Sequence, residues 1–440
     1  MLTNRPLALT LAFAAVVAVA MTVSLAHPDA AGQNAADSAL LDRAHKLLKD
    51  VPLIDGHNDL PWAMRENAGY DFDKLDIKLP QPKLMTDIPK LRQGGLGGQF
   101  WSVYVPATLQ GEHAVSATLE QIDCVYTLVK RYPETFAIAR TADDVERLFK
   151  QGKIASMIGM EGGHSIDNSL ATLRMFAKLG AGYMTLTHTL NTPWADSAND
   201  TPQHNGLTKF GEAVVREMNW LGMLVDLSHV SPDTMQAALR VSEAPVIFSH
   251  SSARALVDVP RDVPDAILQQ LPKNGGVIMI TFVPGFDSTE VAAHSKRESE
   301  QEKQLKAQFA NDENAVKDGV KKWNEANPAP RATVAQVADH IDHVKKIAGI
   351  DHIGLGGDFD GITSVVLGLE DTSKYPVLIA ELLKRGYSDG DVKKILSGNI
   401  LRVMREAEKV SKRLQASRGP NHATLEQLDG PQPKTTQPTK

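Results

Sequence analysis

Cysteine is nearly absent from this chain of 440 residues, in which Cys124 is the single thiol. One thiol cannot form a disulfide within the chain, so a fold built on disulfides is excluded. Cys124 lies in an apolar run over residues 121–126 that carries no metal or catalytic motif. This setting is typical of a small buried side chain.

An excess of basic charge is also missing. Lysine and arginine number 47 against 53 acidic residues, which gives a net charge of -6 and a pI of about 6.2. No basic stripe of domain size occurs, so no nucleic-acid partner is expected. Hydrophobic residues at 42% and charged residues at 23% are typical of a globular protein. Internal repeats are absent as well, which excludes a solenoid.

Only the N-terminus has a long hydrophobic run. Arg5 precedes an apolar stretch over residues 6–26, and Ser24-Leu25-Ala26 resembles a cleavage site for signal peptidase. We predict a signal peptide over 1–26 and export, to the periplasm of a Gram-negative host or otherwise by secretion. The alternative is an uncleaved anchor, because about 20 apolar residues span a bilayer. Contact with a membrane is expected only in that case.

The rest of the chain reads as one domain with additions. Residues 27–40 are small and polar and are expected to form a spacer, followed by a catalytic domain over 41–408. A polar insertion at about 286–331 is favoured as a surface feature over a lid. The tail over 409–440 is rich in proline and polar residues and is expected to be disordered.

Short apolar runs alternate with amphipathic stretches through the domain, which predicts βα units and a parallel sheet. Eight runs are candidate strands, the number found in a TIM-type (β/α)8 barrel of the metal-dependent hydrolase type. The expected strands are Val51–His57, Gly98–Val105, Ala155–Glu161, Tyr183–His188, Met223–His229, Val246–His250, Val277–Phe282 and His352–Asp358.

Most of these runs end on a side chain able to bind a metal. Catalytic groups of a (β/α)8 barrel lie at the carboxyl ends of its strands. Ordinary strand ends carry glycine, asparagine or serine more often, because these residues form turns. The metal-competent ends are His57, Glu161, His188, His229, His250 and Asp358.

The first metal motif is His57-Asn58-Asp59. On an extended strand, residues i and i+2 face the same side, so His57 and Asp59 can reach one ion. Glu161 closes another run and precedes two glycines, which let the backbone pass close to a site. Its two oxygens can bridge two ions, whereas a strand-end ion pair is the alternative reading.

Two further runs end in Ser-His, at His229 and His250, one βα repeat apart. A single strand histidine is usually an ordinary hydrogen-bonded residue, but this repeated placement favours metal ligands. We predict that His57, Asp59 and Glu161 hold one ion, and that Glu161, His229 and His250 hold the second. Nitrogen and oxygen ligands without thiolate favour zinc, with manganese or cobalt as alternatives.

Asp358 ends the last run, before Phe359-Asp360-Gly361. Beside an activated water it can accept a proton and return it to a leaving amine. A turn-forming role before glycine suits Asp360 better than Asp358.

These residues resemble the membrane (renal) dipeptidase family of binuclear zinc metallopeptidases. The resemblance extends over about residues 51–405. Its matching stretches are Ile54–Trp62, Gly97–Tyr104, Glu161–Asp167, Leu186–Asp196, Asp226–Ser231, Pro245–Ala253 and Gly356–Gly361.

The resemblance implies two zinc ions on the ligands above and dipeptides as substrates, with broad side-chain tolerance and acceptance of a C-terminal D-residue. It implies that His188 and Arg261 contact substrate, that Asp358 transfers the proton and that the protein is a homodimer. By sequence alone, either His188 or Arg261 could be an ordinary surface residue, and for Arg261 the sequence alone favours that alternative. Family disulfides and a lipid anchor are not expected here, and Val283 occupies a position where the family has a tyrosine.

Two alternatives stay open at this point. The same metal pair would serve hydrolysis of another small amide, such as a β-lactam or an N-acyl amino acid. A non-catalytic binding protein on the same barrel is the other class, and the complete set of ligands argues against it.

Overall fold

The computed structural model describes residues 30–310 and 312–431. The predicted signal peptide over 1–26 lies outside the described residues, so its cleavage stays a prediction. The chain divides into a unit over Met1–Ala39 and a compact unit over Leu40–Lys440. The predicted spacer is helical from Ala30, where α1 (Ala30–Asp50) begins, because this stretch is rich in alanine. Within the described residues, no helix is long and apolar enough to cross a membrane.

Eight parallel strands close a barrel, which confirms the predicted TIM-type fold. The order around the barrel is β1-β2-β4-β5-β6-β7-β8-β9, and β9 pairs back with β1. The nine strands of the sheet are β1 (Leu53–Asn58), β2 (Leu96–Tyr104), β3 (Phe136–Ile138), β4 (Ile154–Glu161), β5 (Ala181–Thr185), β6 (Leu224–Asp226), β7 (Ile247–Ser251), β8 (Val277–Ile280) and β9 (Ile353–Leu355).

The additional strand β3 was not predicted. It pairs with the first residues of β4, Ile154 to Ser156, whereas β5 pairs with β4 from Ile158 onward. A strand of three residues is too short to show a hydrophobic period, which explains why sequence patterning missed it.

All eight predicted strands exist, but several end earlier than expected. The strands expected to reach His188, His229 and Asp358 end at Thr185, Asp226 and Leu355. His229 and Asp358 have φ values of 66° and 59°, a left-handed conformation that a β-ladder cannot continue. These side chains therefore lie in the loops that follow the strands.

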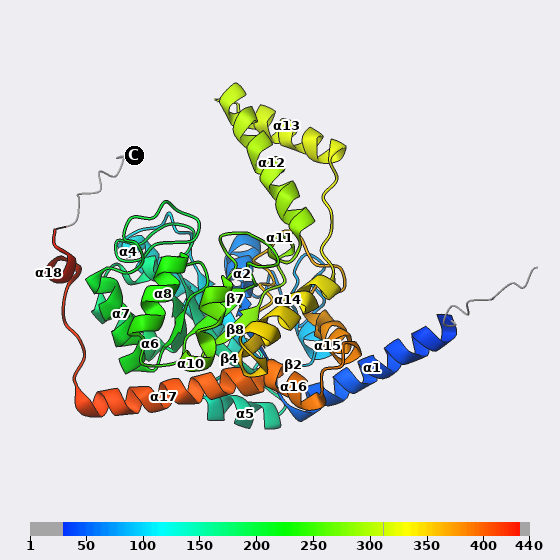
Figure 1. Cartoon of the computed structure of the whole chain (residues 1–440), viewed down its shortest axis with the longest axis horizontal. Coiled ribbons are helices and arrows are strands. Elements are labelled where there is room, and N and C mark those ends of the chain that lie inside the picture. The colour runs from blue at the N-terminus through cyan, green and yellow to red at the C-terminus, as the bar shows by residue number, and fades with distance from the viewer. Residues whose placement is uncertain (1–29, 311, 432–440) are drawn as a thin grey trace, which may run out of the picture. The chain divides into compact units, whose positions relative to one another are not determined.

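Helices surround the strands (Figure 1). The described part of the chain has these helices after α1: α2 (Leu60–Ala68), α3 (Ile88–Gln93), α4 (Glu112–Arg131), α5 (Ala142–Lys150), α6 (Leu170–Leu179), α7 (Lys209–Leu221), α8 (Pro232–Val241), α9 (Asp265–Leu268), α10 (Leu271–Asn274), α11 (Pro284–Asp287), α12 (Thr289–Gln308), α13 (Glu313–Ala326), α14 (Val334–Ile347), α15 (Tyr375–Lys384), α16 (Asp389–Lys393), α17 (Asn399–Ser417) and α18 (Leu425–Asp429).

Helix α17 closes the end of the barrel where the strands begin. Its side chains Ile400, Val403 and Met404 belong to one buried cluster with Leu224 and Val277, which lie at the starts of β6 and β8. The opposite end, where the strands finish, is left for a site.

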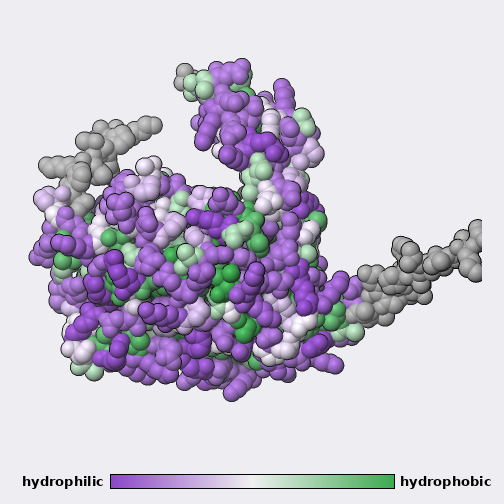
Figure 2. Space-filling view, viewed as in Figure 1, coloured by the Kyte–Doolittle hydropathy of each residue, from purple (hydrophilic) through white to green (hydrophobic). Residues whose placement is uncertain are grey.

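The insertion predicted at about 286–331 forms the helical pair α12 and α13. His294 of α12 packs against Trp323 of α13 with ring centroids 5.2 Å apart, and its Nε2 lies 2.8 Å from the carbonyl oxygen of Asn327. Figure 1 shows the pair extending away from the barrel, and Figure 2 shows that its visible face is largely hydrophilic. These features agree with a surface insertion. Nothing in them tests the alternative, in which the insertion acts as a lid.

The prediction of a disordered tail over 409–440 is wrong for residues 409–431. Helix α17 continues to Ser417, and the segment after it packs on α7. The Asn421 backbone N–H donates to Glu217, and the Asp429 carboxylate accepts from the backbone N–H of Phe210, at the start of α7. Leu425 is buried. Composition alone did not reveal these few specific anchors, and residues 432–440 lie outside the described residues.

Candidate metal centre

The predicted site residues meet at the end of the barrel where the strands finish. His57, Glu161 and His250 lie on strands β1, β4 and β7, and the others follow strands in loops. The structure brings together His57, Asp59, Glu161, His188, His229, His250, Arg261 and Asp358.

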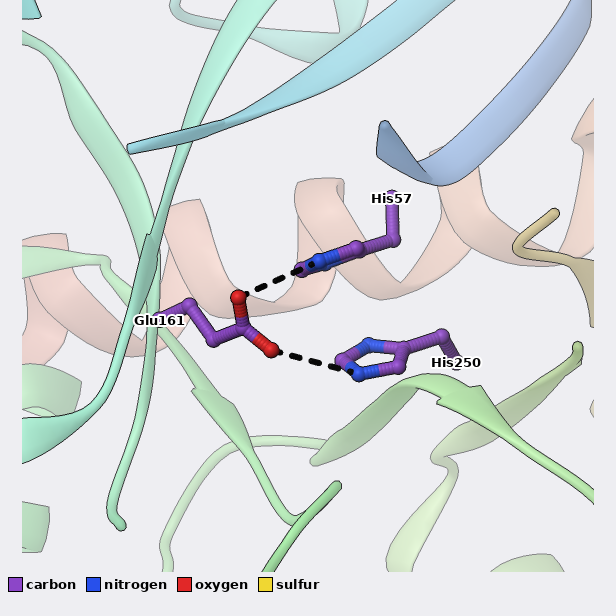
Figure 3. A group of neighbouring side chains, drawn as sticks. All are labelled: His57, Glu161 and His250. Carbon is purple, nitrogen blue, oxygen red and sulfur yellow. Dashed lines mark ion pairs between the residues drawn. The ribbon is translucent and has the colours of Figure 1, made fainter. Parts of the chain in front are cut away.

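Glu161 lies at the middle of this group. Its Oε2 is 3.4 Å from His57 Nε2, and its Oε1 is 2.9 Å from His229 Nε2 and 3.5 Å from His250 Nε2. Figure 3 shows the carboxylate between two imidazoles, with one oxygen directed to His57 and the other to His250. One carboxylate thus serves two sets of nitrogen atoms.

Aspartates complete the group on the His57 side. The Oδ2 of Asp59 is 3.3 Å from His57 Nε2, and the Oδ1 of Asp358 is 4.0 Å from the same nitrogen. Three sets of ligand atoms each lie within 4.8 Å of one another, which suits a shared ion. These sets are His57 with Glu161 and His250, Glu161 with His188 and His229, and His57 with Asp59 and Asp358.

The sets differ from the predicted division in three ways. His250 falls with His57 and Glu161, His188 falls with Glu161 and His229, and Asp358 falls with His57 and Asp59. The histidines fall into these sets because their rings lie close together. The ring centroids of His57 and His250 are only 3.8 Å apart, and those of His188 and His229 are 4.4 Å apart. Ligand spacing along the sequence could not reveal these contacts across the barrel.

Several polar atoms here are buried without a hydrogen-bond partner among the described residues. They are His57 Nε2, Asp59 Oδ1 and His229 Nδ1. Such an atom costs about 1–3 kcal/mol when it stays unpaired. Because His57 Nε2 and Asp59 Oδ1 belong to side chains grouped around a possible ion, the residues present fit metal binding.

The ionisation of Glu161 and His250 also fits. His57 differs, because burial would lower its pKa but its neighbours Tyr183, Glu161 and Asp59 raise it well above its usual value. Burial alone would raise the pKa of Glu161, but the surrounding imidazoles, with His57 first, lower it well below its usual range. Burial lowers the pKa of His250 well below its usual value. An ionised carboxylate and a neutral imidazole are the forms that bind metals. Burial raises the pKa of Asp358 well above its usual range, and the charges of Asp59 and Glu161 add to this rise.

Two site residues hold strained backbone. The left-handed φ angles of His229 and Asp358 cost a residue with a side chain more than glycine. Such strain persists where the surrounding structure enforces it and is concentrated at functional sites. Here it directs both side chains to the centre.

A cavity of about 420 Å³ opens beside the ligands. His188 and Arg261, the predicted substrate contacts, both line it. Arg261 is only 5% exposed, and its Nη2 donates to the carbonyl oxygen of His250 at 3.2 Å. The full lining is Asp59, Trp62, Tyr104, Glu161, His188, His229, Arg261, Val283, Phe286, Asp358, Asp360, Gly361 and Ile362.

Four apolar members of this lining were not predicted. Trp62 and Tyr104 form one wall, with ring centroids 5.0 Å apart. Phe286 lies under Arg261, whose guanidinium carbon is 5.3 Å from the ring centroid, and Ile362 completes the set. Trp62 and Tyr104 end the stretches Ile54–Trp62 and Gly97–Tyr104, so the family resemblance already contained a signal for them.

Comparison with known proteins decides the family. Residues 41–418 match the family model described as membrane dipeptidase, peptidase family M19. The chain belongs to this family. Dipeptidase verJ of Clonostachys rogersoniana is 41% identical over 388 residues, covering 85% of this chain and 89% of that protein. Dipeptidase 3 of Mus musculus is 41% identical over 379 residues, covering 85% and 68%. The protein is therefore a dipeptidase of a metallopeptidase family.

Solved structures agree on the fold. The probable dipeptidase PvdM of Pseudomonas aeruginosa superimposes with a TM-score of 0.74 and 25% identity, over 85% of this dipeptidase and 99% of that chain. A metallopeptidase of Rhodobacter sphaeroides, liganded with a phosphinate mimic of L-Ala-D-Ala, gives a TM-score of 0.67 and 22% identity, over 81% and 99%.

Proposed function

We propose that this dipeptidase holds two zinc ions, tolerates varied side chains in its substrates and accepts a D-residue at their C-terminal position. The observation that supports the proposal best is the place of Glu161. Its two oxygens face different imidazoles at 3.4 Å and 2.9 Å, as a carboxylate shared by two ions requires.

In this assignment His57, Asp59 and Glu161 hold one ion, while Glu161, His229 and His250 hold the other. When bound, a zinc pair polarises a carbonyl group and lowers the pKa of water towards neutrality. The side chains must then place the scissile amide and move protons.

Asp358 is proposed as the proton carrier. It lines the cavity, and its Oδ1 lies 4.0 Å from His57 Nε2, at the edge of the ligand group. From this place it can accept a proton from the attacking water and return it to the leaving amine.

Arg261 is proposed to bind the free carboxylate of the substrate. A guanidinium has five N–H donors, and Nη1 and Nη2 of Arg261 contact Ser251 and the His250 carbonyl, at 3.4 Å and 3.2 Å. The remaining donors suit a carboxylate, which a guanidinium binds through two parallel hydrogen bonds. His188, whose Nε2 is 3.7 Å from Glu161, is proposed to hold the polarised carbonyl oxygen.

Two apolar walls support tolerance for side chains. Trp62 and Tyr104 form one, and Val283, Phe286 and Ile362 line the cavity with Arg261. Apolar surfaces accept many side chains, because adding or removing one methylene changes binding by only about 1–3 kcal/mol. The solved Rhodobacter sphaeroides relative was liganded with a mimic of L-Ala-D-Ala, which makes this dipeptide the natural probe of stereochemistry.

The substrate class is tested by assaying the purified zinc protein on L-Ala-L-Ala, L-Ala-D-Ala, an N-acetyl amino acid and a carbapenem. We expect turnover of both dipeptides and weak turnover of the other two. Faster hydrolysis of the N-acetyl compound or of the carbapenem would replace the proposal with the other amide activity.

The carboxylate role is tested with Arg261→Ala on a dipeptide and on its C-terminal amide. Hydrogen bonds to charged groups contribute about 1.5–3 kcal/mol, so kcat/KM for the dipeptide should fall roughly 10- to 150-fold. The amide lacks the charge and should lose much less. Equal losses on both substrates would assign Arg261 a structural role.

We also propose that residues 1–26 are removed on export and that the mature protein is a homodimer without a disulfide. N-terminal sequencing of protein purified from its native host tests the removal of residues 1–26, because recovery of Met1 would show an uncleaved segment.

Light scattering on the purified protein tests whether it is a homodimer.

A further inference from the structure

Two of the candidate ligands have their far ring nitrogen held by a hydroxyl group. His57 Nδ1 lies 2.9 Å from the Tyr183 hydroxyl, and that hydroxyl donates to the Gly56 carbonyl oxygen at 3.1 Å. His250 Nδ1 lies 2.8 Å from Ser249 Oγ, and Ser249 Oγ donates to Asp226 Oδ2 at 2.6 Å.

These contacts decide where the imidazole proton lies. A hydroxyl has one proton, and an ionised carboxylate can only accept. At 2.6 Å the Ser249 proton therefore belongs to the bond with Asp226, so Ser249 Oγ must accept from His250 Nδ1–H. This tautomer leaves a lone pair on His250 Nε2, the atom 3.5 Å from Glu161 Oε1. A neutral imidazole binds a metal through such a lone pair.

Asp226 itself is fully buried and accepts four hydrogen bonds. Two come from hydroxyl groups, those of Ser249 and Thr185, each at 2.6 Å. Two come from backbone N–H groups, Ser249 at 2.8 Å and Ser228 at 3.1 Å. Ser228 directly precedes His229, so one carboxylate holds the backbone leading to both His229 and His250.

We infer that Asp226 is a positioning residue for the ion bound by Glu161, His229 and His250. Through Ser249 it fixes the tautomer of His250, and through the Ser228 N–H it fixes the turn that presents His229. On the other side of Glu161, His57 depends on Tyr183 and not on Asp226. The inference rests on the proposed two-ion centre. It gives the two ions separate positioning residues, Asp226 with Ser249 for one ion and Tyr183 for the other.

The test compares Asp226→Asn and Ser249→Ala with Thr185→Val. Thr185 donates to the same carboxylate oxygen at the same 2.6 Å as Ser249 but makes no hydrogen bond to an imidazole nitrogen among the described residues, so it is the matched control. Each zinc-loaded protein is equilibrated with increasing concentrations of a zinc chelator. Bound zinc is counted, and anomalous scattering from crystals shows which of the two positions keeps its ion.

Loss of such an outer hydrogen bond lowers metal affinity by about 10- to 100-fold. We expect this loss at the His229–His250 position in Asp226→Asn and Ser249→Ala, with the His57–Asp59 position unchanged. Thr185→Val should resemble the wild type. Tyr183→Phe should weaken the His57–Asp59 position instead.

Wild-type zinc affinity at both positions in Ser249→Ala would overturn the inference, and so would an equal loss in Thr185→Val. Circular dichroism shows whether each variant is folded, and Ser249→Ala decides the matter if Asp226→Asn is not. Zinc affinity is measured without substrate. If the wild-type protein failed to hydrolyse dipeptides, the proposed function would be overturned. The zinc measurements would still decide this inference.

Discussion

Charged side chains are exposed and paired at one end of the barrel and buried at the other. Around a cavity of about 710 Å³ near the strand starts, charges are exposed and paired, as in Lys393 with Asp50 at 2.9 Å and Arg405 with Glu146 at 2.8 Å. At the strand ends, His57 and Glu161 are almost fully buried, and no lysine or arginine pairs with Glu161 among the described residues. Exposed pairs contribute about 0–1 kcal/mol each, whereas buried charges are costly. A buried charged cluster lowers the stability of the fold, so we attribute its presence to function.

The largest effect at the strand ends is expected from Glu161→Gln. Glutamine has a neutral amide with one acceptor oxygen and cannot bridge two cations well. Both ions should be weakened together, and activity should fall by more than the roughly 10²–10⁴-fold typical of losing a general acid–base group. His229→Ala should mainly affect one ion. Metal analysis of the folded variants checks this, and a full pair of zinc ions in Glu161→Gln would contradict the shared role.

Asp358→Asn separates chemistry from metal binding at the same end. The fold and both proposed ions should persist, because Asp358 is not a ligand in the proposed assignment, although it lies in one set of ligand atoms with His57 and Asp59. Turnover should fall by about 10²–10⁴-fold, since the amide cannot carry the proton. Steady-state kinetics with zinc analysis decides the matter: near-normal kcat at full zinc content would remove Asp358 from the mechanism.

His340 is a buried histidine outside the candidate metal centre. It shows what burial alone does to a histidine, for comparison with the histidines at the strand ends. It lies on α14, is 1% exposed, and accepts from the Ala253 backbone N–H at 3.0 Å through Nδ1. Burial lowers the pKa of His340 to about 4. The unfolded chain, with a pKa near 6.5, therefore takes up a proton between these values and the folded protein does not. Stability contributed by neutral His340 is present above about pH 6.5 and is lost as the pH falls towards 4.

His340→Asn keeps an acceptor for the Ala253 N–H and cannot titrate. Between pH 7 and pH 5 the wild type should lose up to about 2 kcal/mol more of its free energy of unfolding than the variant. Urea unfolding at the two pH values measures the difference. Parallel losses in both proteins would contradict a depressed pKa at His340.

The smallest effect is expected at the strand starts. Lys393→Met removes the exposed pair with Asp50 and should change the free energy of unfolding by less than about 1 kcal/mol. Its kcat and KM should match the wild type. A large loss of activity in this variant would show that the two ends of the barrel are coupled.

The sequence predicted the barrel, and it predicted which polar side chains gather where the strands finish, because both depend on local patterns. Apolar runs mark the eight barrel strands, and the metal-competent residue that ends most of these runs is visible in the chain. The left-handed turns at His229 and Asp358, and the close approach of His188 to Glu161 at 3.7 Å, depend on the closed barrel and were not visible. The order of the tail depends on contacts such as Asp429 with Phe210, far apart in sequence.

The central claim is that Glu161 is shared by two zinc ions. Diffraction from crystals of the zinc-loaded wild-type protein, measured at the zinc absorption edge, tests it most directly. The account predicts two anomalous peaks about 3.5–4 Å apart, one beside each carboxylate oxygen of Glu161. A single peak, or peaks that lie away from Glu161, would contradict it.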